Sequence, residues 1–302
     1  MIRILAFALA LAVTVSSPAG AQQTYKTPEE AFDALVAAAK AGDAKAFRAV
    51  LGPNGADIVS SGDPVADKSL REEFLTAYDA KHQIANESDK TMVLVIGPND
   101  FPVPIPLVRQ GDGWRFDVVG ARQEILYRRI GRNELATIQA CLAYVDAQNE
   151  YAAKDREQAR AAYAQRIISR PGRKDGLYWT PADGEDQSPL GELVASASKE
   201  GYRVGSGPVP YHGYYYKVLT RQGPTAPGGA LNYVVRGNMI GGFALVAYPA
   251  QYGNSGVMTF LVNHEGTVFE KDLGPRTAQI AAGMTAFNPD HTWKKVVAQA
   301  AR

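Results

Sequence analysis

The chain contains 302 residues, of which 46% are hydrophobic and 21% are charged. This composition is typical of a soluble globular protein, because a disordered chain is less apolar and more strongly charged. With 32 Lys and Arg against 31 Asp and Glu, the net charge is only +1, so no overall field draws the protein to nucleic acid or to an anionic membrane. We therefore expect no nucleic-acid partner.

Residues 1–21 have the pattern of a secretory signal peptide. Arg3 gives the positive start, residues 4–15 are apolar, and Ala19-Gly20-Ala21 is a small-residue cleavage signal. The apolar run is shorter than the roughly 20 residues that span a bilayer. The sequence predicts cleavage after Ala21, a periplasmic or secreted protein, and no stable membrane insertion afterwards.

The single cysteine, Cys141, excludes an intramolecular disulfide, so the mature chain has to rely on its hydrophobic core. A length of about 280 residues favours two domains. We place the first at residues 22–121 and the second at residues 122–302.

The first domain begins with helices and continues with strands. Thr27-Pro28-Glu29-Glu30 is a capping box that starts a helix ending near Gly42, and further helices are expected from Asp43 to about residue 51 and over residues 64–85. The hydrophobic period then changes to two over residues 91–96 and 114–118, with a turn at residues 97–100. Between them, residues 102–107 alternate proline with apolar residues, which predicts an edge strand.

Helices followed by an antiparallel meander indicate an α+β domain. Residues 24–120, closing on the text GDGWRFD, resemble the cone-shaped folds of the nuclear transport factor 2-like type. In such folds a curved sheet wraps a helix. The resemblance implies that the cone could enclose an apolar pocket.

The second domain is predicted to start with a long helix over about residues 122–165. Its expected apolar seam has near-heptad spacing and contains Leu135, Ile138, Leu142, Val145 and Ala152. After a surface connection over residues 166–190, strands are expected near residues 211–220, 231–236, 242–248, 257–263 and 267–271. The chain returns to helix at residues 277–287 and again after Pro289. The whole is an α+β protein whose long helix packs on an antiparallel meander.

The text NELATIQACLAYVDAQNEY and the sheet after it resemble the head domains of type IV pilins and pseudopilins. Those proteins carry a processing glycine before an apolar, membrane-spanning helix start. Here an ordinary signal peptide replaces it and residues 122–132 are charged, so we do not expect incorporation into a pilus.

The most distinctive text is YHGYYYKVLTRQGPTAPGG, followed by GGFALVAYPAQYGNSGVMTFLVNHEGTVFEKDLGP. It closely resembles the uncharacterised bacterial family known as domain of unknown function 2950, from about Pro28 to the C-terminus. The resemblance implies a secreted bacterial protein. It brings no established activity, so no catalytic residue can be transferred.

Catalytic and metal-binding patterns are missing from the sequence. The four histidines, at positions 82, 212, 264 and 291, form no His-x-x-x-His or His-Glu-x-x-His pair. Asn263-His264-Glu265-Gly266 is typical of a hairpin turn, and His82 and His291 are expected on solvated helix positions. Ser255 lacks the Gly-x-Ser-x-Gly elbow and is expected to cap a loop. Cys141 is expected as a buried apolar residue. The glycines at 205, 207, 228 and 229 lack the strand-to-helix order of a phosphate loop. We predict no catalytic residue, metal or cofactor.

A tyrosine cluster is the best candidate for a binding site, because tyrosine combines a large contact area with a polar tip. Alternation in a strand places Tyr214 and Tyr216 on one face and Tyr215 on the other, so at least one of them should be buried against the long helix. The candidate binding residues are Tyr211, His212, Tyr214, Tyr216, Tyr248, Tyr252 and Asn254.

Three functions remain open. The first is a non-enzymatic interaction protein that contacts a periplasmic partner through its tyrosine-rich sheet and the loops near residues 222–229 and 248–254. This idea fails if Tyr214 and Tyr216 are both buried. The second is a small-ligand binder that uses a cavity in the N-terminal cone. The third is an unrecognised hydrolase in which His212 meets a carboxylate and a nucleophile.

Overall fold

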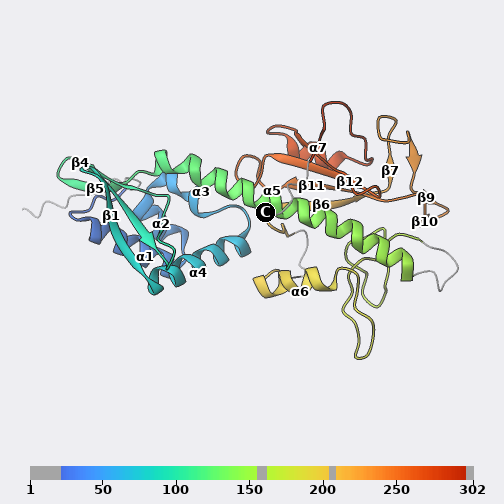
Figure 1. Ribbon diagram of the computed structural model, residues 1–302, viewed down its shortest axis with the longest axis horizontal. Helices are drawn as coiled ribbons and strands as arrows, with labels where there is room; N and C mark the ends of the chain where they lie inside the picture. The colour runs from blue at the N-terminus through green and yellow to red at the C-terminus, as the bar shows by residue number, and fades with distance from the viewer. Residues whose placement is uncertain (1–21, 155–161, 204–208, 297–302) are drawn as a thin grey trace, which may run out of the picture.

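The long helix α5, Val118–Lys154, connects an N-terminal and a C-terminal part that lie toward its two ends (Figure 1). The structure, a computed structural model, describes residues 22–154, 162–203 and 209–296, without the side chains of residues 56 and 57. We call residues 22–117 the N-terminal part and residues 162–296 the C-terminal part. Both combine helices with antiparallel strands, so the α+β class is confirmed.

The three predicted helices of the N-terminal part form where their capping residues place them. Thr27 accepts the backbone N–H of Glu30 at 3.2 Å at the start of α1, Pro28–Ala41. Asp43 and Asp63 cap the next two helices through carboxylate oxygens. These are α2, Ala44–Leu51, and α4, Pro64–Ala80; between them lie a short 3-10 turn, Pro53–Gly55, and α3, Ala56–Val59, which were not predicted.

The small sheet has the strand order β1-β2-β4-β5, with β3 paired to β2, and all pairs are antiparallel. Its strands are β1 His82–Ser88, β2 Thr91–Ile96, β3 Phe101–Pro102, β4 Leu107–Gln110 and β5 Gly113–Phe116. The turn over residues 97–100 is confirmed.

Two predictions for this sheet are wrong. The helix expected over residues 64–85 ends at Ala80, and His82 begins β1, where its ring stacks on Tyr78 at 3.8 Å between centroids. The edge strand expected over residues 102–107 is interrupted between β3 and β4. Three of these six residues are prolines, which have no backbone N–H to donate to a neighbouring strand. Val103 and Ile105 still bury their side chains toward the core, as their alternation predicts.

Helix α5 belongs to both hydrophobic clusters of the chain. Val118 and Ala121 pack with Phe32, Leu107 and Phe116 of the N-terminal part. One face further along the helix packs instead on the C-terminal sheet, through Cys141, Tyr144, Val145 and Ala147. The boundary proposed at residues 121 and 122 stays a prediction.

The prediction for this helix is wrong at both ends and in part of its apolar seam. It begins at Val118 rather than Arg122, and the chain from residue 162 is not helical, so it does not reach residue 165. Its expected seam is confirmed at Val145, which is buried, and at Ile138 and Leu142, which pack on the same core, but is wrong at Leu135, which is 67% exposed. Two polar residues that were not expected on this face, Asn133 and Thr137, are buried. Hydrogen bonds compensate their burial: Asn133 Nδ2 donates to the Ser255 carbonyl at 2.9 Å, and the Thr137 hydroxyl to the Asn133 carbonyl at 2.8 Å.

The C-terminal part is built on a five-stranded antiparallel sheet of order β14-β13-β12-β11-β6. Adjacent β6 residues point to opposite faces: the Tyr216 hydroxyl donates to Thr137 of α5, and Lys217 Nζ donates to the Met284 carbonyl after α7. The helices α5 and α7 therefore cover opposite faces. The elements are α6 Gly191–Glu200, β6 Tyr214–Leu219, β7 Arg221–Gln222, β8 Leu231–Asn232, β9 Val234–Val235, β10 Asn238–Met239, β11 Ala244–Pro249, β12 Met258–Asn263, β13 Val268–Asp272, α7 Thr277–Gly283 and β14 Lys294–Lys295.

Four of the five expected strands form the main sheet, and the differences concern short elements. Residues 231–236 form parts of two separate two-stranded ribbons, β7-β8 and β9-β10, and not a strand of that sheet. The helix expected after Pro289 is wrong over the described residues, where β14 pairs with β13. Helix α6 was not predicted. Within the described residues, no helix is both long and apolar enough to span a membrane.

Candidate functional site

A cavity of about 400 Å³ lies between α6, α5 and the edge strand β6. This volume falls within the range of small-molecule sites, roughly 300–1,000 Å³. We call it the α6 cavity. Aliphatic and tyrosine side chains line most of it: Ala140, Tyr144, Ile167, Ile168, Leu190, Leu193, Val194, Ala197, Ser198, Tyr202, Arg203, Val209, Pro210, Tyr211, Tyr215, Tyr216, Leu245 and Tyr248.

Helix α6 forms one wall of the cavity and is held at both ends. At its start, the backbone N–H of Leu190 donates to the Leu177 carbonyl at 3.0 Å. At its end, Gly201 takes a left-handed conformation with φ +104°, and Tyr202 anchors the chain. Along its length the helix turns Leu193, Val194 and Ala197 toward the cavity. In Figure 1, α6 is the short yellow helix drawn below α5.

Gln148 of α5 fixes the chain segment that closes another side of the cavity. Its side-chain amide accepts the N–H of Ala164 and donates to the carbonyl of the same residue, each at 2.8 Å. This pair of bonds resembles a strand pairing and satisfies a side chain with no exposed surface. Ile167 and Ile168, three and four residues further on, then line the cavity.

Three of the predicted binding residues, Tyr211, Tyr216 and Tyr248, lie in the cavity wall. Burial raises the pKa of Tyr216 well above its usual value, and burial together with the nearby Glu200 carboxylate raises the pKa of Tyr211 to about 12. Both side chains are therefore neutral phenols at physiological pH. The tyrosines therefore add no charge to the cavity wall.

Tyr214 is not a surface residue. Its side chain has no exposed area, its ring packs on Phe260 at 5.9 Å, and its hydroxyl donates to the Met258 carbonyl at 3.0 Å. The expectation that at least one tyrosine is buried under the long helix is confirmed. Of the two tyrosines expected to anchor a partner surface, Tyr214 lies in the core and Tyr216 is half-buried in the cavity wall.

Tyr252 and Asn254 lie away from the cavity, in the loop between β11 and β12. The Tyr252 hydroxyl donates to Asp272 at 3.1 Å, and the Asn254 amide donates to the Ser60 carbonyl of the N-terminal part at 3.2 Å. The Asn254 side-chain oxygen accepts from the buried Arg129 guanidinium, which also donates to the Ile58 carbonyl. Asn254 thus joins the two parts of the chain. Ser255 caps this loop as predicted, since its hydroxyl accepts the Gln251 N–H at 2.9 Å.

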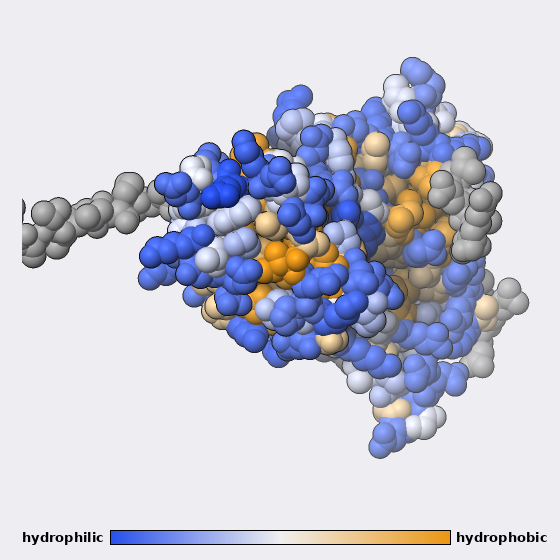
Figure 2. Space-filling model, turned by 60° about the vertical axis from the view of Figure 1, so that its left-hand side comes forward, coloured by the Kyte–Doolittle hydropathy of each residue, from blue (hydrophilic) through white to orange (hydrophobic). Residues whose placement is uncertain are grey.

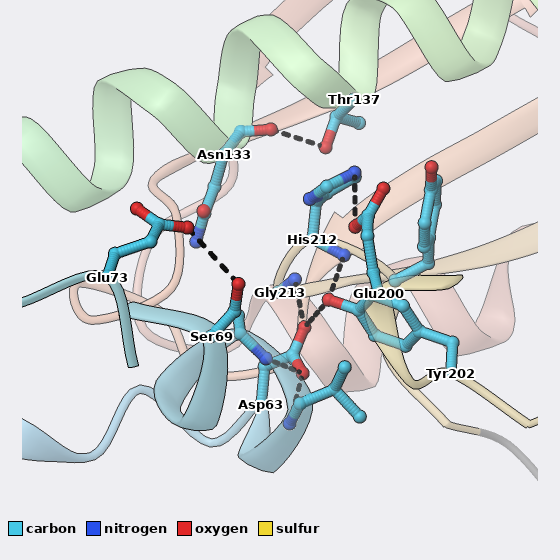
Figure 3. Close-up of polar contacts among 12 residues, drawn as sticks. Asp63, Ser69, Glu73, Asn133, Thr137, Glu200, Tyr202, His212 and Gly213 are labelled. Carbon is cyan, nitrogen blue, oxygen red and sulfur yellow. Dashed lines mark hydrogen bonds and ion pairs between the residues drawn. The ribbon is translucent and has the colours of Figure 1, made fainter. Parts of the chain in front are cut away.

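A second junction is centred on Asp63, which sequence reasoning did not single out (Figure 3). The carboxylate is fully buried and caps α4 through the N–H groups of Val65 and Ala66, each at 3.1 Å. Its other oxygen accepts the Tyr202 hydroxyl at 2.8 Å and the Gly213 N–H at 2.9 Å. The Asp63-Pro64 pair is readable as a helix start, but partners about 140 residues away leave no local signal.

His212 lies beside this junction in a left-handed conformation with φ +49°. Its Nε2 is 3.7 Å from a Glu200 carboxylate oxygen, and its ring lies 4.2 Å from that of Tyr211. Figure 3 shows the imidazole turned toward Glu200 and away from Asp63. No hydroxyl or thiol among the described side chains bonds to the ring. The carboxylate expected for a hydrolase, Glu200, lies beside His212, but among the described side chains the imidazole has no nucleophile as a partner.

Two further hollows have other characters. One, of about 200 Å³ in the N-terminal part, is lined largely by apolar side chains, with Leu70, Phe74 and Ile105 among them. Figure 2 shows apolar side chains gathered on the surface of the N-terminal part, ringed by hydrophilic ones. The other, of about 600 Å³, is lined mainly by polar groups, including Arg166, Arg170 and Asp175. The first is smaller than most ligand sites and the second lacks an apolar wall.

The remaining histidine and cysteine predictions can be assigned. His264 lies in the β12–β13 turn, as expected, and Cys141 is fully buried. His291 does not start a helix. Residues 205–207 lie outside the described residues. Within the described part of the chain, no group of three or more His, Cys, Asp or Glu side chains is arranged to hold a metal ion.

Comparison with known families places the chain. The sequence model of the family described as "Protein of unknown function (DUF2950)" matches residues 22–296. The chain belongs to this family. No curated protein and no solved structure matches it, so the resemblances of its two parts to pilin heads and to nuclear transport factor 2-like folds are not confirmed. The cavity and the junctions therefore have to be interpreted from their own chemistry.

Proposed function

We propose that this DUF2950 protein is a non-enzymatic binding protein that holds a small, largely apolar molecule in the α6 cavity. The observation that carries the proposal is a cavity of about 400 Å³ lined by aliphatic and neutral aromatic side chains. Apolar side chains that face a cavity lack packing contacts on that side, and a bound apolar molecule supplies them. The tyrosine tips offer hydrogen bonds that orient the molecule.

The chemistry of the lining limits the ligand. Arg203 is the one charged side chain among the described lining residues, and no carboxylate is in that set. A ligand with several charges would lose its hydration against aliphatic walls without gaining partners. A neutral molecule with a ring or a branched chain fits this environment.

We also propose that the protein works outside the cytoplasm. The support is the signal-peptide pattern of residues 1–21, which lie outside the described residues. A periplasmic or extracellular ligand would then reach the cavity directly.

The cavity favours a ligand over the two other functions. A partner surface loses Tyr214, which lies in the core, and a hydrolase needed a nucleophile beside His212. A ligand site in the N-terminal part remains a second candidate, supported by the 200 Å³ hollow.

The test uses the neutral fluorescent probe N-phenylnaphthylamine and a variant that fills the cavity. Leu193→Trp puts a larger side chain into the lining, so we expect the dissociation constant of the probe to rise about tenfold or more. The matched control is Leu135→Trp on α5, where the side chain is 67% exposed and distant from the lining. Leu70→Trp fills the N-terminal hollow and separates the two candidate sites.

Fluorescence titration of the four proteins distinguishes the outcomes. Loss of binding in Leu193→Trp alone supports the α6 cavity. Loss in Leu70→Trp alone moves the site to the N-terminal part. Equal binding by all variants, or no binding by the parent protein, would overturn the proposal.

A further inference from the structure

We infer that Asp63 is a positioning residue for the α6 cavity, although it belongs to the N-terminal part and does not line the cavity. The inference rests on the proposed function of that cavity. It assigns to Asp63 and Tyr202 the task of holding two walls of the site at a fixed separation. It also makes ligand binding depend on how the N-terminal part is attached.

One oxygen of Asp63 holds both walls. It accepts the hydroxyl of Tyr202, directly after the C-terminal cap of α6, and the N–H of Gly213, directly before β6. The end of α6, which carries the aliphatic lining, and the start of β6, which carries tyrosines of the lining, thus bond to the same oxygen atom. Hydrogen bonds to a carboxylate are about twice as strong as those between neutral groups, and this carboxylate has no exposed surface.

The ring contacts extend this anchor into the cavity. The rings of Tyr202 and Tyr211, which both line the cavity, meet edge to face at 5.1 Å. The Tyr202 hydroxyl also accepts the N–H of His212 at 3.3 Å. Moving Tyr202 away from Asp63 would therefore shift Tyr211 and the start of β6 as well.

Gly213 gives an independent sign that the close approach is built in. Its φ is +75°, and a Cβ at this position would lie 2.6 Å from Asn133 Nδ2 and 2.9 Å from Ser255 Cβ. A side chain would force the backbone away from α5. Glycine therefore permits the contact that brings the Gly213 N–H to Asp63.

The carboxylate's other oxygen connects this arrangement to α4. It caps the helix through Val65 and Ala66, so displacing Asp63 loosens the first turn of α4 and the cavity walls together. Because coupling between two sites is reciprocal, a ligand that fixes the walls should also protect the first turn of α4.

The experiment compares Tyr202→Phe and Asp63→Asn with Asp43→Asn. Tyr202→Phe keeps the ring that lines the cavity and removes the bond to Asp63. Asp43 caps α2 through Lys45 and Ala46 in the same way that Asp63 caps α4, but it has no bond to the C-terminal part among the described contacts. Asparagine caps a helix about as well as aspartate, so both Asp→Asn variants keep a cap, and Asp43→Asn controls for replacing a capping carboxylate with a neutral amide.

We expect Tyr202→Phe to weaken binding of N-phenylnaphthylamine about fivefold or more, because it removes the hydrogen bond to Asp63 and the one from the His212 N–H. Asp63→Asn should weaken binding at least as much. Asp43→Asn should leave the affinity unchanged. In the parent protein, saturating probe should slow hydrogen exchange at the amides of Val65 and Ala66, and this protection should disappear in Tyr202→Phe.

The outcomes separate this inference from the function on which it rests. If the parent protein binds no probe, the proposed function fails. If the parent and Tyr202→Phe bind equally, or Asp43→Asn loses as much affinity as Tyr202→Phe, the cavity stands and the positioning role is overturned. Should Asp63→Asn fail to fold, Tyr202→Phe and the exchange at α4 still decide the question.

Discussion

Buried hydroxyl and thiol groups of the C-terminal core lower the stability of the protein as the pH becomes alkaline. Burial raises the pKa of the Cys141 thiol to about 12, and it raises the pKa values of Tyr144 and Tyr216 above their usual value of 10.0. The folded state therefore holds these protons more tightly than the unfolded state. Their contribution to stability is complete below the unfolded pKa values, near 9.0 for Cys141 and 10.0 for the tyrosines, and is lost as pH rises toward the folded values.

We expect the urea midpoint of unfolding to fall as pH rises above about 9, first through Cys141 and then through the tyrosines. Cys141→Ala removes the thiol contribution, so its midpoint should begin to fall at a higher pH than that of the parent protein. A midpoint that stays constant through this range would contradict the assignment of these groups to a dry core.

The residues of the candidate site differ in how far the sequence could reveal them. The run Tyr211 to Tyr216 attracts attention by composition, and strand alternation correctly separates its two faces. The same alternation cannot tell a covered face from an open one, which is why Tyr214 was expected at a surface. Tyr202 and Asp63 carry no local signal for their contact, because the bond between them exists only after the chain has folded.

At the scale of elements, Gly131 is a weak point in α5. It lies between the segments of the helix that belong to the two cores, and a Cβ added there would meet no atom within 4 Å. Glycine inside a helix is less favourable than alanine by roughly 0.5–1 kcal/mol, because it loses more backbone freedom on folding. We therefore expect Gly131→Ala to stabilise the protein by about that amount, measured by urea denaturation.

Gly120 in the first turn of the same helix is the matched control. A Cβ there would lie 2.4 Å from Asp117 Oδ2, and the Asp117 carboxylate accepts the Gly120 N–H at 2.9 Å. Gly120→Ala should stabilise less than Gly131→Ala or should destabilise. If Gly131→Ala lowers the stability, the helix needs local freedom at this point.

Elements with strong local chemistry were predictable, and those that depend on distant partners were not. Thr27 and Asp43 fix helix starts through their own neighbours, and the strands from residue 242 onward are apolar runs separated by turn-forming residues. Two polar residues of the buried face of α5, Asn133 and Gln148, were missed because their partners lie on other segments. Helix α6 has only 10 residues, so the apolar periodicity of its sequence is weak evidence for a helix.

At the scale of the molecule, two hydrophobic clusters share one helix and two polar junctions. Trp114 lies in the N-terminal cluster and Cys141 in the C-terminal cluster, and both are buried. Independent unfolding of either part is opposed by the continuous α5, by the Asp63 junction, and by the bonds of Arg129 to Ile58 and Asn254, which we call the Arg129 junction. We expect the two clusters to unfold in one transition, in contrast to separate domains on a loose linker.

The Arg129 junction gives the means to test this coupling. Arg129 is 6% exposed and donates to the Ile58 carbonyl on one side and to Asn254 on the other. Arg129→Met keeps most of the apolar stem and removes these donors, at a cost of roughly 2 kcal/mol. The control, Arg128→Met, removes an exposed ion pair with Glu124 and a contact of the guanidinium with the exposed Phe101 ring at 5.6 Å, each of which contributes about 1 kcal/mol or less.

Two local reporters can follow the clusters in the same urea titration. With Trp179 and Trp293 replaced by Phe, fluorescence reports Trp114, and alkylation of Cys141 reports exposure of the C-terminal core. We expect coincident midpoints in this background and with Arg128→Met. With Arg129→Met we expect separated midpoints, because the N-terminal part then loses one of its two polar junctions with the C-terminal part. Separate midpoints in the parent background would show that α5 transmits little stability between the cores. Coincidence in Arg129→Met would assign the coupling to the helix and the Asp63 junction.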